Sequence, residues 1–262
     1  MTDPNPFQWP LGKKAAVSLT FDDARLSQID VGIPLLNQFG LKGTFFVSLT
    51  AMLKRLDGWR AAVRAGHEVG NHTVKHPCTG NFHWCAQTAL EDYTLDQMAA
   101  ELDEANAQIE KQIGIRPQSF AYPCGQTFVG CGVNTRSYVP LVAERFLVGR
   151  GFSLKVPNNP WRCDLAQVMG VDFDCQPIEE IQRQIEQARA SGSWIVFAGH
   201  EMGATQSQSV SEAVLTPLCR YLTESADLWV DTTANIGAYV AEARRTTGLT
   251  EVRDGKPGNA TK

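Results

Sequence analysis

Short apolar runs alternate along the chain with longer segments in which apolar residues recur every three or four positions. Eight of these runs are short and bounded by turn-forming residues, which is the pattern of β-strands. They occupy residues 15–21, 43–48, 67–71, 119–123, 145–149, 168–173, 194–199 and 228–232.

Helices are predicted between these strands. One begins after Thr94, a favourable N-cap residue, and keeps a single apolar face. That face consists of Leu95, Met98, Leu102, Ala105 and Ile109. The other predicted helices cover residues 33–39, 53–65, 135–144, 178–190, 210–224 and a last segment that ends at Arg245.

About seven strand–helix units favour a closed parallel barrel over an open sheet. We therefore expect an α/β barrel whose chemistry lies where the strands end. No repeat, low-complexity block or linker divides the chain, so residues 1–262 are predicted to form one domain with a core of about residues 14–246. The polar, turn-rich residues 250–262 are predicted to be a frayed tail.

The composition, with 43% hydrophobic and 20% charged residues, is that of an ordinary globular protein. A net charge of -4 offers no basic surface for nucleic acid or acidic membranes. No apolar run approaches the ~18 residues of a membrane span. Because the first residues do not resemble a signal peptide, the expected compartment is the cytoplasm, or the extracellular space if a leader has been removed.

Seven cysteines, an odd number in a long chain, argue against a disulfide framework. Cys78 could pair with Cys85, or Cys124 with Cys131. The favoured interpretation is free cysteines in a reducing compartment.

Two adjacent carboxylates, Asp22 and Asp23, follow the first predicted strand. Neighbouring side chains of a strand point to opposite sides unless the chain is already turning. Two ionised carboxylates also repel, so a positive group is needed nearby. The competing interpretation is a solvated turn, because Asp is common in loops.

The third predicted strand leads into HTVKHP, in which His72 and His76 are four residues apart. On a helix this spacing would place both imidazoles on one face, as in HExxH zinc proteases. Residue 73 is Thr, so the general-base glutamate of that motif is missing. The flanking glycines and proline also disfavour a long helix. Two neutral histidines and a carboxylate are nevertheless a standard set for catalytic zinc, and Asp22–Asp23 at another strand end supports a metal site.

The remaining histidines occupy different settings. His200 follows the apolar strand 194–199, a position that suits a general acid. His67, inside the third strand, is predicted to be buried and hydrogen-bonded. His83, in the loop 77–93, is predicted to be a surface residue.

The strings TFDD, HTVKH and YPCG and a strand that ends in His200 follow one another in this order. In this the chain resembles the polysaccharide deacetylases, which are carbohydrate esterase family four or the NodB-homology family. The resemblance covers roughly residues 14 to 240, and GHEVGNHTVKHP is its most specific element. It implies a distorted (β/α)7 barrel and a hydrolase that acts on carbon–nitrogen bonds other than peptide bonds, with an acetylated carbohydrate as its substrate.

The resemblance also implies a role for each matching residue. Asp23, His72 and His76 match the metal ligands, usually for Zn²⁺, with Co²⁺ or Ni²⁺ as other possible ions. Asp22 matches the general base that deprotonates a metal-activated water. His200 matches the general acid that protonates the leaving group.

The third motif of the family falls on residues 122–125. There the backbone N–H after the proline, here that of Cys124, helps to bind the oxyanion, and Tyr122 is assigned to the same region. The family's arginine two residues before the proline is replaced by Ala121. We hypothesise that Arg150, at the end of a neighbouring strand, supplies the missing charge; an ordinary surface ion pair is the competing explanation.

Other assignments concern the surroundings of the site. Asp172 is the candidate for orienting His200, with Asp174 as the second choice. Aromatic residues in long loops could stack on sugar rings or serve only in packing. They are Trp84 and Trp161, with Phe82 and Phe128.

The predicted function is removal of acetyl groups from N-acetylated sugars of the chitin or peptidoglycan type. One alternative is an O-acetyl esterase of xylan-like sugars, and another is a metal-independent hydrolase of small cyclic amides. A sugar-binding pseudoenzyme is the non-enzymatic alternative, against which the retention of both Asp22 and His200 argues. The sequence does not indicate an oligomeric state.

Overall fold

Eight parallel strands form the main sheet of the computed structural model, which describes residues 6–152, 155–203 and 207–247. The strands are β1 (Ala15–Asp22), β2 (Thr44–Val47), β3 (Glu68–Asn71), β4 (Ser119–Ala121), β7 (Val148–Arg150), β8 (Gly170–Asp172), β9 (Trp194–Gly199) and β12 (Leu228–Val230). Their order is β7-β4-β3-β2-β1-β9-β8, and β12 pairs with the first residues of β1. Every predicted strand therefore overlaps an observed one.

The two ends of this series almost meet. At the end of β7, Arg150 forms an isolated parallel bridge with Val168, two residues before β8. The Gly151 amide donates to the Val168 carbonyl at 2.8 Å, and the Val168 amide donates to the Gly149 carbonyl at 2.8 Å. The expected distorted (β/α)7 barrel is thereby confirmed as a nearly closed barrel of seven parallel strands, with β12 as an additional strand.

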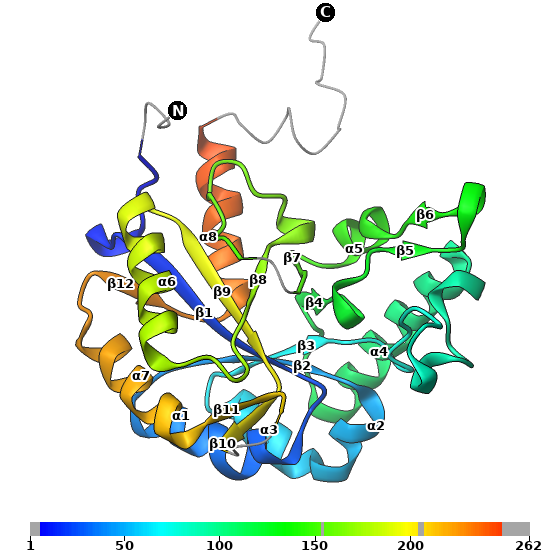
Figure 1. Ribbon diagram of the computed structural model, residues 1–262, viewed down its shortest axis with the longest axis horizontal. Helices are drawn as coiled ribbons and strands as arrows, with labels where there is room; N and C mark the ends of the chain where they lie inside the picture. The colour runs from blue at the N-terminus through cyan, green and yellow to red at the C-terminus, as the bar shows by residue number, and fades with distance from the viewer. Residues whose placement is uncertain (1–5, 153–154, 204–206, 248–262) are drawn as a thin grey trace, which may run out of the picture.

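Helices surround the strands in Figure 1. They are α1 (Ile33–Gln38), α2 (Leu49–Met52), α3 (Leu56–Arg64), α4 (Leu95–Ile113), α5 (Val139–Arg145), α6 (Ile178–Ser191), α7 (Glu212–Glu224) and α8 (Thr233–Thr246). A π-helical turn, Gln28–Gly32, leads into α1. Among the described residues, no helix combines the length and the apolar character needed to cross a membrane.

Two short pairings were not predicted. β5 (Phe128–Val129) pairs antiparallel with β6 (Arg136–Ser137), and β10 (Glu201–Gly203) pairs parallel with β11 (Ser209–Ser211). Strands of two or three residues are too short to show a periodicity of their own. Because β6 occupies residues 136–137, α5 begins later than the predicted start at residue 135.

All eight residues of β1 are buried, because one face points into the barrel and the other packs against helices. On the helix side, the Phe21 ring packs against Phe45 and Phe173 at centroid distances of 5.6 and 5.7 Å. The inner face carries the alternate residues, among them Ser18 and Thr20. These small side chains leave space inside the barrel for larger groups from other strands.

The predicted N-cap of α4 gives a test of the local assignment. Thr94 accepts a hydrogen bond from the Gln97 amide at 3.2 Å, and the Gln97 side chain accepts from the Thr94 amide at 2.8 Å. We expect Thr94→Ala to lower the free energy of unfolding by about 1 kcal/mol, because the Gln97 amide at the start of α4 loses the hydroxyl that accepts its hydrogen bond. Thr94→Ser is the matched control and should stay near wild type in urea denaturation. Equal losses in both variants would show that the hydroxyl cap is not responsible.

Candidate active site

The chain turns sharply at the end of β1. Asp22 is the last residue of the strand, and Asp23 and Ala24 follow in the left-handed region with φ of 74° and 53°. The turn brings both carboxylates to one imidazole. Asp22 Oδ2 lies 4.0 Å and Asp23 Oδ1 3.6 Å from Nε2 of His72. The condition for the two aspartates to act together, a chain that is already turning, is therefore met.

The two histidines of HTVKHP lie on a loop and not on a helix. Thr73 and His76 have positive φ values of 64° and 52°. The rings of His72 and His76 nevertheless converge, with centroids 4.7 Å apart. Nε2 of each ring lies 3.6 Å from Asp23 Oδ1. The HExxH helix is thus excluded, while the predicted group of three is brought together.

These three side chains fit a small divalent ion. His72 Nδ1 lies 2.8 Å from the Ala121 carbonyl, which only accepts, so Nδ1 carries a hydrogen and Nε2 is the ring nitrogen directed at Asp23. Burial is the main cause that lowers the pKa of His76 to about 4, so this ring is neutral at pH 7. In a tetrahedral zinc site, oxygen and nitrogen ligands stand about 3.4 Å apart, close to the observed 3.6 Å.

Asp23 completes this set as a carboxylate. Burial raises its pKa, but the neighbouring His72, His76 and Arg25 outweigh burial, and the net shift is downward. Its second oxygen, Oδ2, accepts a hydrogen bond from Arg25 at 2.8 Å. Oδ1 is therefore the oxygen that faces the two histidines.

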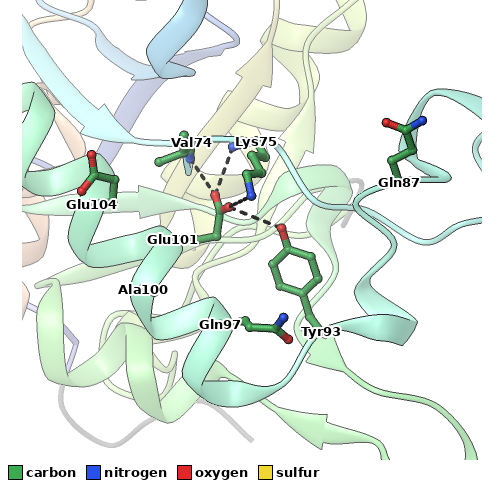
Figure 2. Close-up of a pocket in the computed structure, with 8 residues that line it drawn as sticks. All are labelled: Val74, Lys75, Gln87, Tyr93, Gln97, Ala100, Glu101 and Glu104. Carbon is green, nitrogen blue, oxygen red and sulfur yellow. Dashed lines mark hydrogen bonds and ion pairs between the residues drawn. The ribbon is translucent and has the colours of Figure 1, made fainter.

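Helix α4 stabilises the conformation of the histidine loop, residues 72–77. Oε2 of Glu101 accepts hydrogen bonds from the amides of Val74 and Lys75, each at 3.0 Å. Figure 2 shows this carboxylate between the loop and the hydroxyl group of Tyr93, which lies 3.3 Å from Oε1. Glu101 was not predicted from the sequence, although a glutamate on the apolar side of α4 is the signal that could have revealed it.

Asn71 holds the start of the same loop. Its side-chain oxygen accepts from the Thr73 amide at 2.7 Å, and its amide group donates to the Leu102 carbonyl at 3.0 Å. The Thr73 hydroxyl in turn accepts from the His76 amide at 2.9 Å. This chain of hydrogen bonds stabilises the left-handed conformations that direct both imidazoles toward Asp23.

The pocket drawn in Figure 2 has a volume of about 440 Å³ and is distinct from the site just described. It is lined by Val74, Lys75, Gln87, Tyr93, Gln97, Ala100, Glu101 and Glu104. Neither aspartate of the site and none of its histidines belongs to this lining. The pocket therefore lies between the histidine loop and α4, outside the candidate active site.

A buried arginine neutralises Asp22. Arg150 is fully buried and donates from one terminal nitrogen to Asp22 Oδ1 and from the other to the Gly151 carbonyl at 3.1 Å. Its guanidinium carbon also lies 5.1 Å from the centre of the Phe46 ring. Burial raises the pKa of Asp22. The positive charge of Arg150, with smaller contributions from His72 and His200, lowers this pKa by more than burial raises it, so the net shift is downward. The alternative of an exposed surface ion pair is wrong.

The position of Arg150 depends on its neighbours in the barrel. In the register of β4 and β7 its partner is Ala121, the residue that stands where the family carries its arginine. On the other side lies Gly170, where an added Cβ would come within 2.7 Å of Arg150 Cδ and 2.3 Å of the Gly151 carbonyl oxygen. Ala121 on β4 and Gly170 on β8, on either side of Arg150, are thus small enough to leave room for its side chain.

His200 is oriented by Asp174 and not by Asp172. Its Nδ1 lies 2.5 Å from Asp174 Oδ2, and its backbone amide donates to Asp174 Oδ1 at 3.0 Å. The preference for Asp172 was wrong because β8 ends at Asp172, and the carboxylate two residues later reaches across to the end of β9. Burial lowers the pKa of His200, but the hydrogen bond to Asp174 and the charge of Asp22 raise it more, so the net shift is upward.

Gln28 connects the two strand ends that carry Asp22 and His200. Its side-chain nitrogen donates to the Asp22 carbonyl at 2.6 Å and to the His200 carbonyl at 2.9 Å. The residue is fully buried at the start of the π-helical turn. Gln28 was not predicted to lie in the site, since a glutamine in a polar segment carries no signal of burial.

A disulfide joins the histidine loop to the YPCG segment. Cys78 is bonded to Cys124, across 46 residues of sequence, so the expectation of free cysteines and the pairings Cys78–Cys85 and Cys124–Cys131 are wrong for these residues. Cys124 has a φ of 51°. Within the described residues, no acceptor is found for its backbone amide, which leaves this N–H available to another group.

Two other predicted residues pack elsewhere in the protein. Tyr122 is buried, with its hydroxyl bonded to the Ala166 carbonyl at 2.7 Å, so its side chain belongs to the core. Trp161 packs on Phe7 at 4.8 Å, in the cluster around Trp194. Because Trp194 begins β9 and His200 follows its end, Trp161 lies at the wrong end of the barrel for the predicted sugar contact.

Trp84 remains a candidate for a sugar contact. It is 61% exposed and stacks on Phe82 with centroids 4.6 Å apart. The adjacent Cys85 is buried, and its sulfur lies 3.8 Å from the His76 carbonyl. The two histidines outside the site lie as expected. His67 is buried, with Nδ1 accepting from the Gly43 amide at 3.1 Å, and His83 is exposed.

Comparisons with known proteins agree with this architecture. The family model described as polysaccharide deacetylase matches residues 11–135. A gellan lyase from a Bacillus species is 30% identical over 152 residues, which are 57% of this chain and 5% of that protein. Chitin deacetylase 1 from Cryptococcus neoformans is 28% identical over 107 residues, which are 41% of this chain and 20% of that protein. The chain thus spans only a small part of the length of these relatives.

Solved structures share the fold over nearly the whole chain. A Mycobacterium smegmatis protein assigned to the polysaccharide deacetylases has a TM-score of 0.67 at 18% identity, and the match covers 100% of this chain and 98% of that one. PuuE allantoinase has a TM-score of 0.67 at 14% identity, with 94% and 95% of the two chains covered. At these identities the likeness concerns the fold alone.

The buried ion pair leads to a stability prediction. Arg150→Met would leave the Asp22 carboxylate buried without its cation, and we expect the free energy of unfolding to fall by about 3–5 kcal/mol. The double variant Arg150→Met with Asp22→Asn removes both charges and should recover a large part of this loss in urea denaturation. A single variant as stable as wild type, or a double variant with additive losses, would contradict the pairing.

The contact between His200 and Asp174 leads to a second prediction. Asp174→Asn removes the charge that supports the imidazolium, so the pKa of His200 should fall. NMR titration of the His200 ring resonances measures this shift. Asp172→Asn is the matched control and should change the pKa much less. Equal shifts in the two variants would show that Asp174 has no special role.

Proposed function

Because residues 11–135 belong to the polysaccharide deacetylase family, we propose that the chain is a metal-dependent hydrolase that removes acetyl groups from N-acetylated carbohydrates. The observation that carries this proposal is the convergence of five side chains from three strand ends. Asp22 and Asp23 come from β1, His72 and His76 from the loop after β3, and His200 from the end of β9.

The proposed metal ligands are Asp23, His72 and His76. Their ligand atoms lie within 4.8 Å of one another, and the two neutral imidazoles and one carboxylate form a donor set that suits Zn²⁺ and also Co²⁺ or Ni²⁺. A divalent ion bound there would polarise an acetyl carbonyl and lower the pKa of water toward ~7.

Asp22 is proposed to be the general base. Arg150 occupies Oδ1, while Oδ2 faces the histidines at 4.0 Å from His72 Nε2. Oδ2 is therefore the oxygen placed to take a proton from the attacking water. The lowered pKa keeps Asp22 ionised at neutral pH, despite its burial, and so ready to accept that proton.

Cys124 and His200 are proposed to act on the carbonyl oxygen and on the leaving group. The Cys124 amide would donate to the oxyanion, and loss of one such donor costs roughly 10²–10³ in rate in other enzymes. His200, whose pKa is raised by Asp174 and Asp22, holds its proton more strongly than an ordinary histidine and would deliver it to the leaving amine. The proton that Asp22 takes and the proton that His200 gives balance the hydrolysis.

Arg150 is proposed to replace the arginine that the family carries at the place of Ala121. The two residues are direct partners in the register of β4 and β7, so a guanidinium from either strand enters the same part of the barrel. The positive charge that stabilises the Asp22 carboxylate would then come from β7 in this chain and from β4 in the family pattern.

The substrate is proposed to be an acetylated sugar polymer or oligomer of the chitin or peptidoglycan type. The family supports a carbohydrate substrate. The exposed Trp84, stacked on Phe82 beside the histidine loop, offers a surface on which a sugar ring could stack. The chemistry of the site serves an O-acetyl ester equally well, so amide and ester substrates must be compared by experiment.

Acetate release tests this function. The chain loaded with Zn²⁺ or Co²⁺ is assayed on chitin oligomers, peptidoglycan fragments and acetylxylan, and we expect turnover on an N-acetylated substrate that chelation abolishes. Asp22→Asn and His200→Gln should each lower kcat by about 10²–10⁴. Asp30→Asn, in an exposed pair with Arg55, is the matched control and should keep wild-type activity.

The possible outcomes separate the alternatives. A chain that binds no metal would favour a metal-independent hydrolase of small cyclic amides. A chain that binds metal with the proposed ligands but releases no acetate from any of these substrates would favour a sugar-binding protein. Faster release from acetylxylan than from both N-acetylated substrates would assign an esterase.

A further inference from the structure

His76 has a second group of potential ligands on the side away from Asp23. Nε2 of the ring lies 3.6 Å from Asp23 Oδ1, and Nδ1 lies 3.6 Å from the sulfur of Cys78. That sulfur is bonded to Cys124. A nitrogen of His76 and the two sulfurs all lie within 4.8 Å of one another. One imidazole thus stands between a carboxylate–histidine set and a pair of cysteines.

We propose that reduction of the Cys78–Cys124 disulfide creates a second metal site. In it the two thiolates and Nδ1 of His76 bind a thiophilic divalent ion such as Zn²⁺ and withdraw His76 from the set with Asp23 and His72. This inference rests on the proposed function in one respect, namely that His76 is a ligand of that first set.

The geometry suits such a site. Two cysteines and one histidine are an established zinc ligand set that leaves a fourth position open. With usual bond lengths, a sulfur and a nitrogen ligand of tetrahedral zinc are about 3.6 Å apart, which is the distance from His76 Nδ1 to the Cys78 sulfur. The two sulfurs must separate to about 3.8 Å once their bond is broken. Cys124 is exposed and can make that movement, while Cys78 is buried beside His76.

The two sites exclude each other because they share one ring. A neutral imidazole has a single lone pair, so Nε2 carries a hydrogen whenever Nδ1 binds a metal. In the first set His76 must bind through Nε2, and in the second through Nδ1. An ion held by the cysteines therefore leaves only Asp23 and His72 for the other site.

The redox step balances as ordinary thiol–disulfide exchange. A dithiol reductant gives two electrons and two protons to the Cys78–Cys124 bond, which becomes two thiols, while the reductant becomes a disulfide. Binding of a divalent ion to these thiols then releases two protons. The exposed side of Cys124 gives the reductant access to the bond. Catalysis through His76 would accordingly be confined to oxidising surroundings.

Cobalt spectroscopy tests this inference on the full chain. Co²⁺ is titrated into the oxidised protein and into protein that has been reduced with a dithiol and freed of it without air. We expect the oxidised protein to bind Co²⁺ without a thiolate-to-cobalt charge-transfer band, and the reduced protein to develop that band with one equivalent. Absence of the band in the reduced protein would overturn the proposal, as would two bound ions per chain.

The control is the double variant Cys78→Ser with Cys124→Ser, which keeps Cys85, Cys131, Cys163, Cys175 and Cys219. After reduction it should show no band, and a band as strong as that of the wild type would assign the cobalt to other cysteines. A second measurement needs no variant. Alkylation of the reduced wild type at Cys78 and Cys124, located by mass spectrometry, should abolish the band, and a band that persists would again overturn the proposal.

A second variant separates this inference from the proposed function. Asp23→Asn with His72→Gln removes two ligands of the first set and none of the second. Its oxidised form should lose cobalt binding, and its reduced form should keep the charge-transfer band. If the oxidised wild type binds no Co²⁺, the proposed function fails while the band still decides the second site. If the band disappears in this variant, the thiolate site is not independent of Asp23 and His72, and the inference fails.

Discussion

The ion pair between Arg150 and Asp22 is the interaction on which the rest of the site depends. The carboxylate of Asp22, the last residue of β1, is buried, and burial alone would favour its protonated form. Arg150 reverses that preference and is itself buried, so neither charge can exist there without the other. The barrel accommodates the pair through small residues, Ala121 on one side and Gly170 on the other.

The second constraint is the left-handed backbone that directs the proposed metal ligands. Asp23, Thr73 and His76 all have positive φ values, which cost free energy in residues other than glycine. The cost is offset by specific hydrogen bonds. Glu101 binds two amides of the histidine loop, and the Thr73 hydroxyl binds the His76 amide. The conformation of the histidine loop is therefore stabilised by polar contacts from outside the barrel, in particular from α4.

Much of the fold could be predicted from the sequence, because buried parallel strands and amphipathic helices leave strong periodic patterns. The order TFDD, HTVKH, YPCG and His200 also placed the main site residues on strand ends, where the barrel brings them together. Cys78–Cys124 could not be predicted, since its two halves lie 46 residues apart and only the closed barrel makes them neighbours. The choice between Asp172 and Asp174 depended on where β8 ends, and strand ends are the least certain feature of a periodic pattern.

The central claim, that a guanidinium inside the barrel maintains Asp22 as the catalytic base, is tested most directly by moving the arginine. kcat/KM for acetate release is compared in wild type, Arg150→Ala, and Arg150→Ala combined with Ala121→Arg. We predict that kcat/KM falls at least about tenfold in the single variant, which corresponds to about 1.4 kcal/mol. We also predict a substantial recovery in the double variant, because the two positions are partners in the β4–β7 register. An Arg150→Ala enzyme with unchanged kcat/KM and an unchanged acid limb of its pH profile would contradict the central claim.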